Sequence, residues 1–219
     1  MIDLKALMAP FPAERVSWRV GSTSADKKRG MALAYMDARD VMEVDWGALG
    51  PAVRWGVSRA NAERVTPGDP AATLIITGFI ARNVQGLQTT LGRNGSDFSA
   101  SIFGDLLDAD EIHIWTGVDG VLSADPRRVP DATVIDSLSY QEAMELAYFG
   151  AKVIHPQTMA PAVDKGIPIR IRNTFAPEKP GTLICARPVS SHLVKGITSI
   201  DETALVNVEG AGMIGVPGT

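Results

Sequence analysis

The stretch Thr73-Leu74-Ile75-Ile76-Thr77, closed by Gly78, decides the fold class of this 219-residue chain. A continuous run of apolar and β-branched residues that ends in glycine is typical of a strand covered on both faces of a sheet. Downstream of it, expected strands alternate with expected helices; the strands lie at 111–115, 167–171 and 182–185, and the helices at 98–107, 140–149 and 155–166. This alternation, with Gly-rich loops at the strand ends, predicts an α/β sandwich with a largely parallel sheet.

The sequence before this stretch is less regular. Residues 31–36 predict the end of a helix, and 40–44 predict a short strand. Apolar residues at helical spacing predict a helix over 51–64, with Pro51 in its first turn. The break at 66–70, which reads Thr-Pro-Gly-Asp-Pro, is the expected internal boundary, and residues 1–30 are expected to be irregular.

Two helices carry explicit start or stop signals. Ser139 and Glu142 form a capping box, in which each side chain satisfies the other residue's backbone N–H. Gly150 and Gly166 follow the last periodic residues of two helices, where glycine is the usual end signal.

Composition excludes several classes of protein. With 45% hydrophobic residues, the chain has enough apolar surface to fold. Its longest apolar runs fall short of the roughly 18 residues needed to cross a membrane, and we expect no signal peptide after Lys5. A net charge of -4 argues against nucleic acid as the main partner. The single cysteine, Cys185, favours a reducing compartment, the cytoplasm.

The first candidate site is the segment Gly92-Arg93-Asn94-Gly95-Ser96-Asp97, between a strand-like segment and a helix. Backbone N–H groups at a helix start attract anions, and glycines allow a ligand to approach closely. Arg93 offers a planar fork suited to a carboxylate or phosphate, while Asp97 could hold an ammonium group or orient Arg93. A tight turn with Ser96 as the helix cap is the alternative interpretation.

The second candidate is the segment 115–121, which leaves the carboxyl end of an expected strand and continues to Arg127. Open α/β sheets bind ligands at such ends, and a nucleotide could lie there with its phosphates near Arg127. A surface loop with solvated arginines is the alternative.

The third candidate is the segment 150–156 around Lys152. A cation after a helix C-terminus is favourable in any case, so Lys152 has a structural explanation as well. His155 before Pro156 is expected to be a cap or core residue. Three histidines and one cysteine make a His/Cys metal site implausible, and no metal-ligating residues are assigned.

Taken together, four ordered motifs resemble the signature series of the aspartokinases, and above all the kinase portion of bifunctional aspartokinase enzymes. The resemblance covers about 34–185. The motifs are Leu91-Gly92-Arg93-Asn94-Gly95-Ser96-Asp97, Trp115-Thr116-x-Val118-Asp119-Gly120-Val121, Ala124-Asp125-Pro126-Arg127 and Phe149-Gly150-Ala151-Lys152-Val153-Ile154-His155-Pro156.

The resemblance implies an αβα sandwich of the amino acid kinase type. It also implies transfer of the γ-phosphoryl group of ATP, with Mg²⁺, to the side-chain carboxylate of L-aspartate. Arg93 would bind a substrate carboxylate and Asp97 the substrate amino group, with Phe79 and Ser96 lining the same pocket. The nucleotide would be contacted by Thr116, Gly117, Leu122, Arg127, Lys152 and Val153. Arg93, Asp97 and Lys152 would be the catalytic residues, and an amino-acid effector and a homo-oligomer are further expectations.

The sequence also departs from the family pattern. Where aspartokinases have a Lys-Phe-Gly-Gly-Thr-Ser phosphate loop, residues 19–24 read Arg-Val-Gly-Ser-Thr-Ser, and Gly117 and Leu122 replace an aspartate and an aromatic residue. We therefore expect an incomplete N-terminal lobe. The expected divisions are a degenerate phosphate-loop region at 1–30, a remnant of the acceptor lobe at 31–66, the nucleotide-binding part at 67–187 and the start of a shortened ACT regulatory domain at 188–219.

Three functions stay open from the sequence. The first is an aspartate kinase in a shortened form whose activity must be tested. The second is a nucleotide-binding remnant without catalysis. The third is another carboxylate kinase of the same fold, such as a relative of glutamate kinase.

Overall fold

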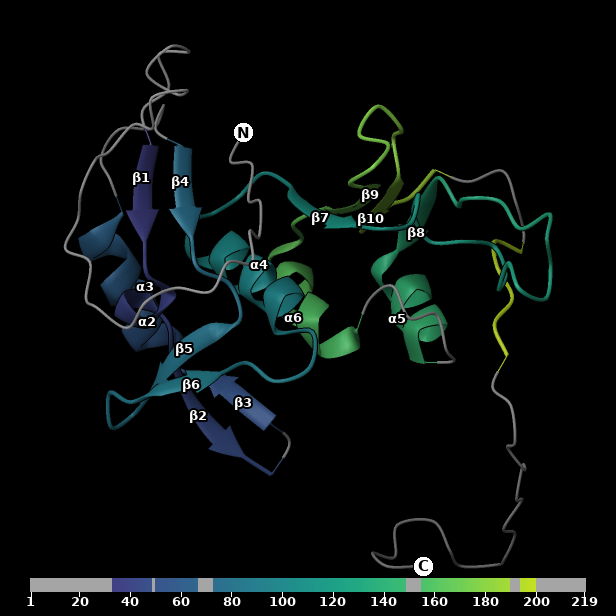
Figure 1. The fold of residues 1–219 in the computed structure, drawn as a ribbon. Helices are drawn as coiled ribbons and strands as arrows, with labels where there is room; N and C mark the ends of the chain where they lie inside the picture. The colour runs from purple at the N-terminus through teal and green to yellow at the C-terminus, as the bar shows by residue number, and fades with distance from the viewer. Residues whose placement is uncertain (1–32, 49, 67–72, 149–154, 190–193, 200–219) are drawn as a thin grey trace, which may run out of the picture.

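The structure, a computed structural model, describes residues 33–48, 50–66, 73–148, 155–189 and 194–199 (Figure 1). The elements in chain order are β1 (Leu33–Met36), α2 (Ala38–Val41), β2 (Glu43–Gly47), β3 (Gly50–Val53), α3 (Trp55–Val65), β4 (Thr73–Ile76), β5 (Ile80–Asn83), β6 (Gln88–Thr90), α4 (Gly95–Leu106), β7 (Ile112–Thr116), β8 (Ser137–Ser139), α5 (Tyr140–Tyr148), α6 (Pro156–Lys165), β9 (Ile169–Asn173) and β10 (Thr182–Cys185).

The described strands form three sheets. β1 and β4 make a parallel pair, while the other two sheets have the strand orders β7-β9-β10-β8 and β3-β2-β5-β6. Within the first of these, β7 pairs with β9 and β8 with β10 in parallel, whereas β9 and β10 are antiparallel. The expected α/β class is confirmed, with mixed rather than uniformly parallel pairing in the two larger sheets.

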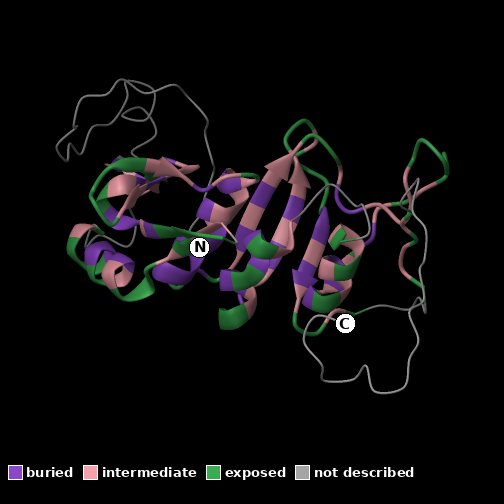
Figure 2. Ribbon diagram, turned by 90° about the horizontal axis from the view of Figure 1, so that it is seen from below, coloured by how far each residue is buried: buried purple, intermediate pink, exposed green. Residues whose placement is uncertain are grey.

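Alternating isoleucines on β7 and β9 create one core. Ile112, Ile114, Ile169 and Ile171 are each 7% exposed or less, and they pack with residues of α5 and α6 (Figure 2). Because side chains on a strand alternate between faces, these four residues share one face of the sheet. α4 and α6 lie side by side below β7 and β9 in Figure 1. Gly104 lets α4 pack closely against β7, since a Cβ there would come within 2.6 Å of Ile112 Cδ1.

A second core lies under the N-terminal sheets. It contains Met36, Met42 and Val44, together with Ile102 and Phe103 from α4. α4 also packs against β7 of the first core. α4 therefore packs against both hydrophobic cores, and its position fixes the turn at residues 92–94 that precedes it.

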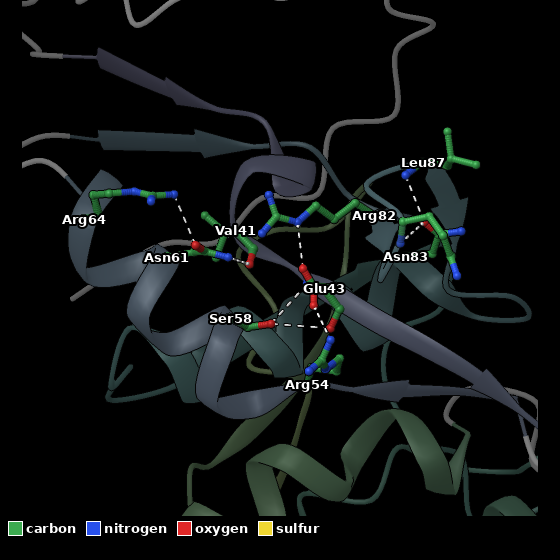
Figure 3. A network of polar contacts seen from close by, with 10 residues as sticks. Val41, Glu43, Arg54, Ser58, Asn61, Arg64, Arg82, Asn83 and Leu87 are labelled. Atoms are coloured by element: carbon green, nitrogen blue, oxygen red, sulfur yellow. Dashed lines mark hydrogen bonds and ion pairs between the residues drawn. The ribbon is translucent and has the colours of Figure 1, made fainter.

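A polar network stabilises the N-terminal part (Figure 3). The Glu43 carboxylate, 12% exposed, accepts hydrogen bonds from Arg54 Nη1 at 2.8 Å and Arg82 Nε at 3.2 Å. The Glu43 backbone N–H donates to Ser58 Oγ at 3.1 Å, and Ser58 is fully buried. The network joins β2, β5 and α3, so it links elements that are far apart in sequence.

Several expectations for this region were wrong. Residues 33–36 form β1 instead of the end of a helix. Of the strand expected over 40–44, residues 40 and 41 belong to α2, whereas 43 and 44 begin β2. Pro51 lies in β3, before the helix that it was expected to open. Asp37 explains α2, because its carboxylate accepts the Arg39 backbone N–H at 2.9 Å and starts the helix.

Other expectations were confirmed or changed in detail. β4 forms as expected, but Ile75 is 40% exposed, so this strand is not covered on both faces by the described residues. The Ser139–Glu142 capping box forms in both directions, at 2.7 and 3.1 Å. Gly166 ends α6 with φ +69°. The break expected at 66–70 lies almost wholly outside the described residues, as do the phosphate-loop region 19–24 and Gly150.

Candidate active site

The starts of α4 and α6 lie at the same edge of the sheet as the ends of β7 and β9. α4 leads into β7 through a short turn and packs back against it, so its first residue, Gly95, lies toward Thr116 at the end of β7. The lengths agree, because 12 helical residues span about 18 Å and five strand residues about 17 Å. α6 is related to β9 in the same way. Since β7 and β9 are parallel, the starts of both helices and the ends of both strands share this edge.

The turn before α4 has an unusual backbone. Gly92 and Asn94 have φ of +73° and +54°, and Asn94 is the helix cap. Ser96 therefore lies inside the helix, and the alternative in which it caps the helix is wrong. Trp46 lies close to the turn, because a Cβ at Gly92 would come within 3.5 Å of its ring.

Phe79 lies against the same turn. Its own φ is +72°, a conformation that side chains rarely adopt. Its N–H donates to Ser99 Oγ at 2.8 Å, and its carbonyl accepts from the Leu91 N–H at 2.9 Å. Ser96 is adjacent, since a Cβ at Gly78 would come within 3.9 Å of Ser96 Cα. Phe79 and Ser96 thus lie on neighbouring segments, and the common pocket that the resemblance implies for them stays a prediction.

Arg93 lies in the turn before α4 and Asp97 in the first turn of the helix, and the two residues have different environments. The Arg93 residue is exposed, whereas Asp97 is partly buried. Burial raises the pKa of Asp97, and the hydrogen bond from Ser96 Oγ at 3.5 Å offsets this only in part. Among the described residues, no cation pairs with the Asp97 carboxylate. Asp97 therefore does not orient Arg93, and its carboxylate is suited to a cationic ligand.

The loop after β7 is held by the neighbouring strand. The Thr116 carbonyl accepts the Thr174 N–H at 2.8 Å. The Asp119 carboxylate accepts Asn173 Nδ2 at 2.5 Å and Lys179 Nζ at 2.6 Å. These two hydrogen bonds, that of Lys179 first, hold the pKa of Asp119 below its usual value. Apart from its chain neighbours, no heavy atom of the described residues lies within 4 Å of a Cβ placed on Gly117, so these residues leave space for a ligand there.

The next turn of the loop is fixed by Thr182. A Cβ at Gly120 would come within 2.5 Å of Thr182 Oγ1. That oxygen accepts the Val121 N–H at 2.9 Å and donates to the Ile135 carbonyl at 2.7 Å. Leu122 then pairs with Val134 in an antiparallel bridge. The backbone that carries Leu122 is therefore well ordered relative to β10.

Arg127 lies farther along this loop. Its Nε is 3.0 and 3.1 Å from the two Asp125 carboxylate oxygens, and its Nη2 is 2.6 Å from Oδ2. The Arg127 side chain is 79% exposed. It is thus aligned by Asp125 and still accessible to an anion.

The third candidate segment is described only at its end. Lys152 and Val153 lie outside the described residues. His155 is the residue before α6, but its side chain makes no capping hydrogen bond, and Nδ1 is buried without a hydrogen-bond partner in the described part of the chain. Its backbone carbonyl accepts Thr158 Oγ1 at 2.7 Å.

Several contacts at this edge were not predicted. Asn173 and Lys179 hold Asp119 from 54 and 60 residues away. The Arg172 guanidinium lies 4.8 Å from the centre of the Trp115 ring, on the adjacent strand. Such pairs depend on strand register, and no short-range pattern in the sequence marks them.

The described ranges contain neither a cluster of metal-ligating residues nor a membrane-spanning helix. They contain no group of three or more His, Cys, Asp or Glu residues that could hold a metal ion. Among the same residues, no helix is both long enough and apolar enough to cross a membrane.

Comparison with known proteins identifies the family. The family model described as "Amino acid kinase family" matches residues 22–173, more than half of the chain. The chain belongs to the amino acid kinase family. This assignment accounts for the α/β fold and for the glycine-rich loops at one edge of the sheet.

Relatives of this chain include proteins named as bifunctional aspartokinase/homoserine dehydrogenases. The chain is 48% identical over 201 residues to a maize protein named bifunctional aspartokinase/homoserine dehydrogenase 1, chloroplastic. This match covers 89% of the chain and 22% of the maize protein. It is 51% identical over 146 residues to the bifunctional aspartokinase/homoserine dehydrogenase of Haemophilus influenzae. That match covers 66% of this chain and 18% of the relative. The chain thus spans about a fifth of the length of these curated relatives.

A solved structure agrees with these matches. The crystal structure of Escherichia coli aspartokinase III in complex with aspartate and ADP superposes with a TM-score of 0.70 and 34% sequence identity. The match covers 78% of this chain and 38% of the Escherichia coli chain.

Proposed function

We propose that this chain carries the nucleotide side of an aspartate kinase, which transfers the γ-phosphoryl group of ATP to the side-chain carboxylate of L-aspartate. The observation that carries the proposal is the convergence of the 92–97 turn and the 116–120 loop at one edge of the sheet. The first segment offers Arg93 for a carboxylate and Asp97 for an ammonium group of an amino acid. The second offers space beside Gly117, next to backbone that is hydrogen-bonded to the neighbouring strand. The names of the relatives support the same reaction.

The aspartate would bind at the turn before α4. The exposed Arg93 fork would bind a substrate carboxylate through two parallel hydrogen bonds. Asp97, partly buried and without a cation among the described residues, would bind the ammonium group. Phe79 and Ser96 would form the adjacent wall.

The nucleotide would bind along the loop after β7. Thr116 and Gly117 would contact the base or ribose, and Leu122 would flank the adenine. Arg127 would reach the phosphates from its position beside Asp125. Lys152 and Val153, which precede α6, would complete the phosphate site.

The chemistry needs few groups from the protein. A carboxylate is already a nucleophile at neutral pH, so no general base is required. Catalysis then depends on alignment and on stabilising the charge of the transferred group. Mg²⁺, when bound with the nucleotide, would supply positive charge that offsets the charge of the transferred group.

Further parts of the proposal follow from the resemblance. We infer a reducing compartment such as the cytoplasm, and an ACT regulatory region that begins after about residue 188. Residues 194–199 form no strand in the structure, and residues 200–219 lie outside the described part. A solved structure of Escherichia coli aspartokinase III in complex with lysine and aspartate supports an amino-acid effector for the longer relatives of this chain. A homo-oligomer is proposed on the same basis.

The test is an assay of the purified chain with ATP, Mg²⁺ and L-aspartate, in which hydroxylamine traps the acyl phosphate. Aspartyl hydroxamate above background supports the proposal, and its absence rejects catalytic competence. Turnover with glutamate but not aspartate would favour another carboxylate kinase of this family.

A second candidate is nucleotide binding without catalysis. It is favoured by residues 19–24, where arginine replaces the phosphate-loop lysine and serine replaces a glycine. Arginine is planar and bulkier than the compact ammonium group of lysine, so the exchange is not neutral at a phosphate. Calorimetry decides between the two: heat of ADP binding without turnover supports the second candidate.

A further inference from the structure

Residues 194–199 lie against the start of α5 and the loop 121–135 (Figure 1, in yellow). We refer to residues 194–199 as the strap. Lys195 Nζ donates to Glu142 Oε2 at 2.7 Å, and the Lys195 side chain is only 12% exposed. The same oxygen accepts the Ser139 N–H at 2.7 Å, so Lys195 binds to the capping box that starts α5.

The backbone of the strap contacts the loop directly. The Ile197 N–H donates to the Ser123 carbonyl at 2.8 Å. A Cβ at Gly196 would come within 3.3 Å of both the Ser123 carbonyl oxygen and Ile135 Cδ1, and within 3.5 Å of Leu146. The strap therefore lies in the angle between this loop and α5.

The loop 121–135, which the strap contacts, has its two ends paired as a short antiparallel ribbon. The Ser123 N–H donates to the Thr133 carbonyl at 2.8 Å, and the Thr133 N–H donates to Ser123 Oγ at 3.0 Å. The Ile135 N–H donates to the Val121 carbonyl at 2.8 Å. These bonds leave the Ser123 carbonyl on the outer edge of the ribbon, where the strap occupies it.

Apolar burial contributes little to this contact. Val194 and Ile197 are 70% and 72% exposed. The contacts that hold the strap include the Lys195 ion pair, the Ile197–Ser123 backbone hydrogen bond and the close fit of Gly196. Burial alone would raise the pKa of Glu142, but the hydrogen bonds from Lys195 and Ser139 lower it overall, which keeps the carboxylate charged.

We propose that the strap is a positioning element for the loop 121–135, and that Lys195 thereby sets the affinity of the chain for an adenine nucleotide. The inference rests on the proposed function, which assigns Leu122 and Arg127 of this loop to the nucleotide. Lys195 itself touches no nucleotide; it acts through Glu142 and the ribbon. Removing its charge takes away the ion pair that joins the strap to α5, so the ribbon is held less firmly and can shift.

The experiment compares Lys195→Met with Lys195→Arg, which keeps the charge, and with Lys165→Met as the matched control. Lys165 also pairs with a carboxylate, but that of Asp108 at the far end of α4. ADP affinity is measured by calorimetry, and amide exchange is followed for peptides covering 121–135. Gly196→Val is a second variant that displaces the strap without changing charge.

We expect the Lys195→Met and Gly196→Val chains to bind ADP about three- to fivefold more weakly, a loss of the size expected for one partly exposed ion pair. Exchange in 121–135 should be faster in both. Lys195→Arg should restore affinity, and Lys165→Met should change neither affinity nor loop exchange.

Two results would overturn the inference while the proposed function stands. One is ADP affinity in both strap variants equal to that of the unmodified chain. The other is a loss of affinity in Lys165→Met as large as that in Lys195→Met. An unmodified chain that binds no ADP would overturn both the inference and the proposed function.

Discussion

The ring of Phe79 occupies the space that a side chain at Gly95 would need. A Cβ placed on Gly95 would come within 2.6 Å of Phe79 Cδ2 and 3.1 Å of Leu91 Cβ. Phe79 has little freedom to move, because its φ is +72° and its N–H and carbonyl are both hydrogen-bonded. The glycine at the first position of α4 is thus required by Phe79, which directly precedes β5 and lies 16 positions earlier in the sequence.

The first prediction is that Gly95→Ala destabilises the fold. Overpacking of this kind costs about 1–3 kcal/mol. For a chain of this size, that corresponds to a decrease of about 2–4 °C in Tm for each kcal/mol. Thermal unfolding measures it, and Gly56→Ala in α3 is the control, since a Cβ there meets no atom within 4 Å. Equal Tm values for the two variants would contradict the crowding at Phe79.

The second prediction compares two glycines with the same backbone. Gly166 and Gly181 have φ of +69° and +71°, but a Cβ at Gly166 meets open space, whereas one at Gly181 would overlap the Ile171 carbonyl oxygen. Gly166→Ala should cost about 1–2 kcal/mol from the left-handed conformation alone. Gly181→Ala should cost more than about 4 kcal/mol, because backbone must move. Denaturant unfolding measures both, and similar losses would show that φ alone matters.

The third prediction concerns the Asp125–Arg127 pair. Hydrogen bonds from the Arg127 side chain and backbone lower the pKa of Asp125 from 3.8 to about 2. A depressed carboxyl pKa contributes stability that is present above pH 3.8 and lost as pH falls toward 2. A carbon-detected NMR titration of Asp125 measures this, and Arg127→Gln should raise its pKa toward the ordinary value. An unchanged titration in that variant would exclude Arg127 as the cause.

The fourth prediction tests the Glu43 network (Figure 3). Glu43→Gln keeps the shape of the side chain but removes the charge that holds Arg54 and Arg82. The loss should be about 1–2 kcal/mol, below the full value of charged hydrogen bonds because Arg54 is half exposed. Urea unfolding provides the measurement. Glu63→Gln, at an exposed residue of α3, should be neutral, and a neutral Glu43→Gln would refute the network's role.

The fifth prediction addresses the proposed substrate site. Arg93→Lys keeps the charge but loses the planar fork, so kcat/KM for aspartate should fall by about tenfold or more. ADP affinity should be unchanged, because Arg93 lies on the turn before α4. Arg187→Lys at an exposed residue is the control. Steady-state kinetics and calorimetry separate the two effects, and a loss of ADP affinity in Arg93→Lys would assign this residue to the nucleotide instead.

The helix and strand signals in the C-terminal half were reliable because they are local. The capping box of Ser139 and Glu142 and the end of α6 at Gly166 need only bonds within a few residues. In the N-terminal half, the same reasoning assigned residues 40 and 41 to a strand although they end α2, because one turn of helix next to a strand has no period long enough to detect.

The sequence by itself determined the α/β class, the positions of most C-terminal elements and the turn that carries Arg93 and Asp97. Glycines, caps and β-branched runs act through the backbone of their own neighbourhood, so a linear pattern reveals them. The tertiary structure alone decided that Phe79 packs on Gly95, that Asn173 and Lys179 hold Asp119, and that Lys195 reaches Glu142. These contacts join residues 16 to 60 positions apart, and they exist only once α4 and α6 have folded back against parallel strands.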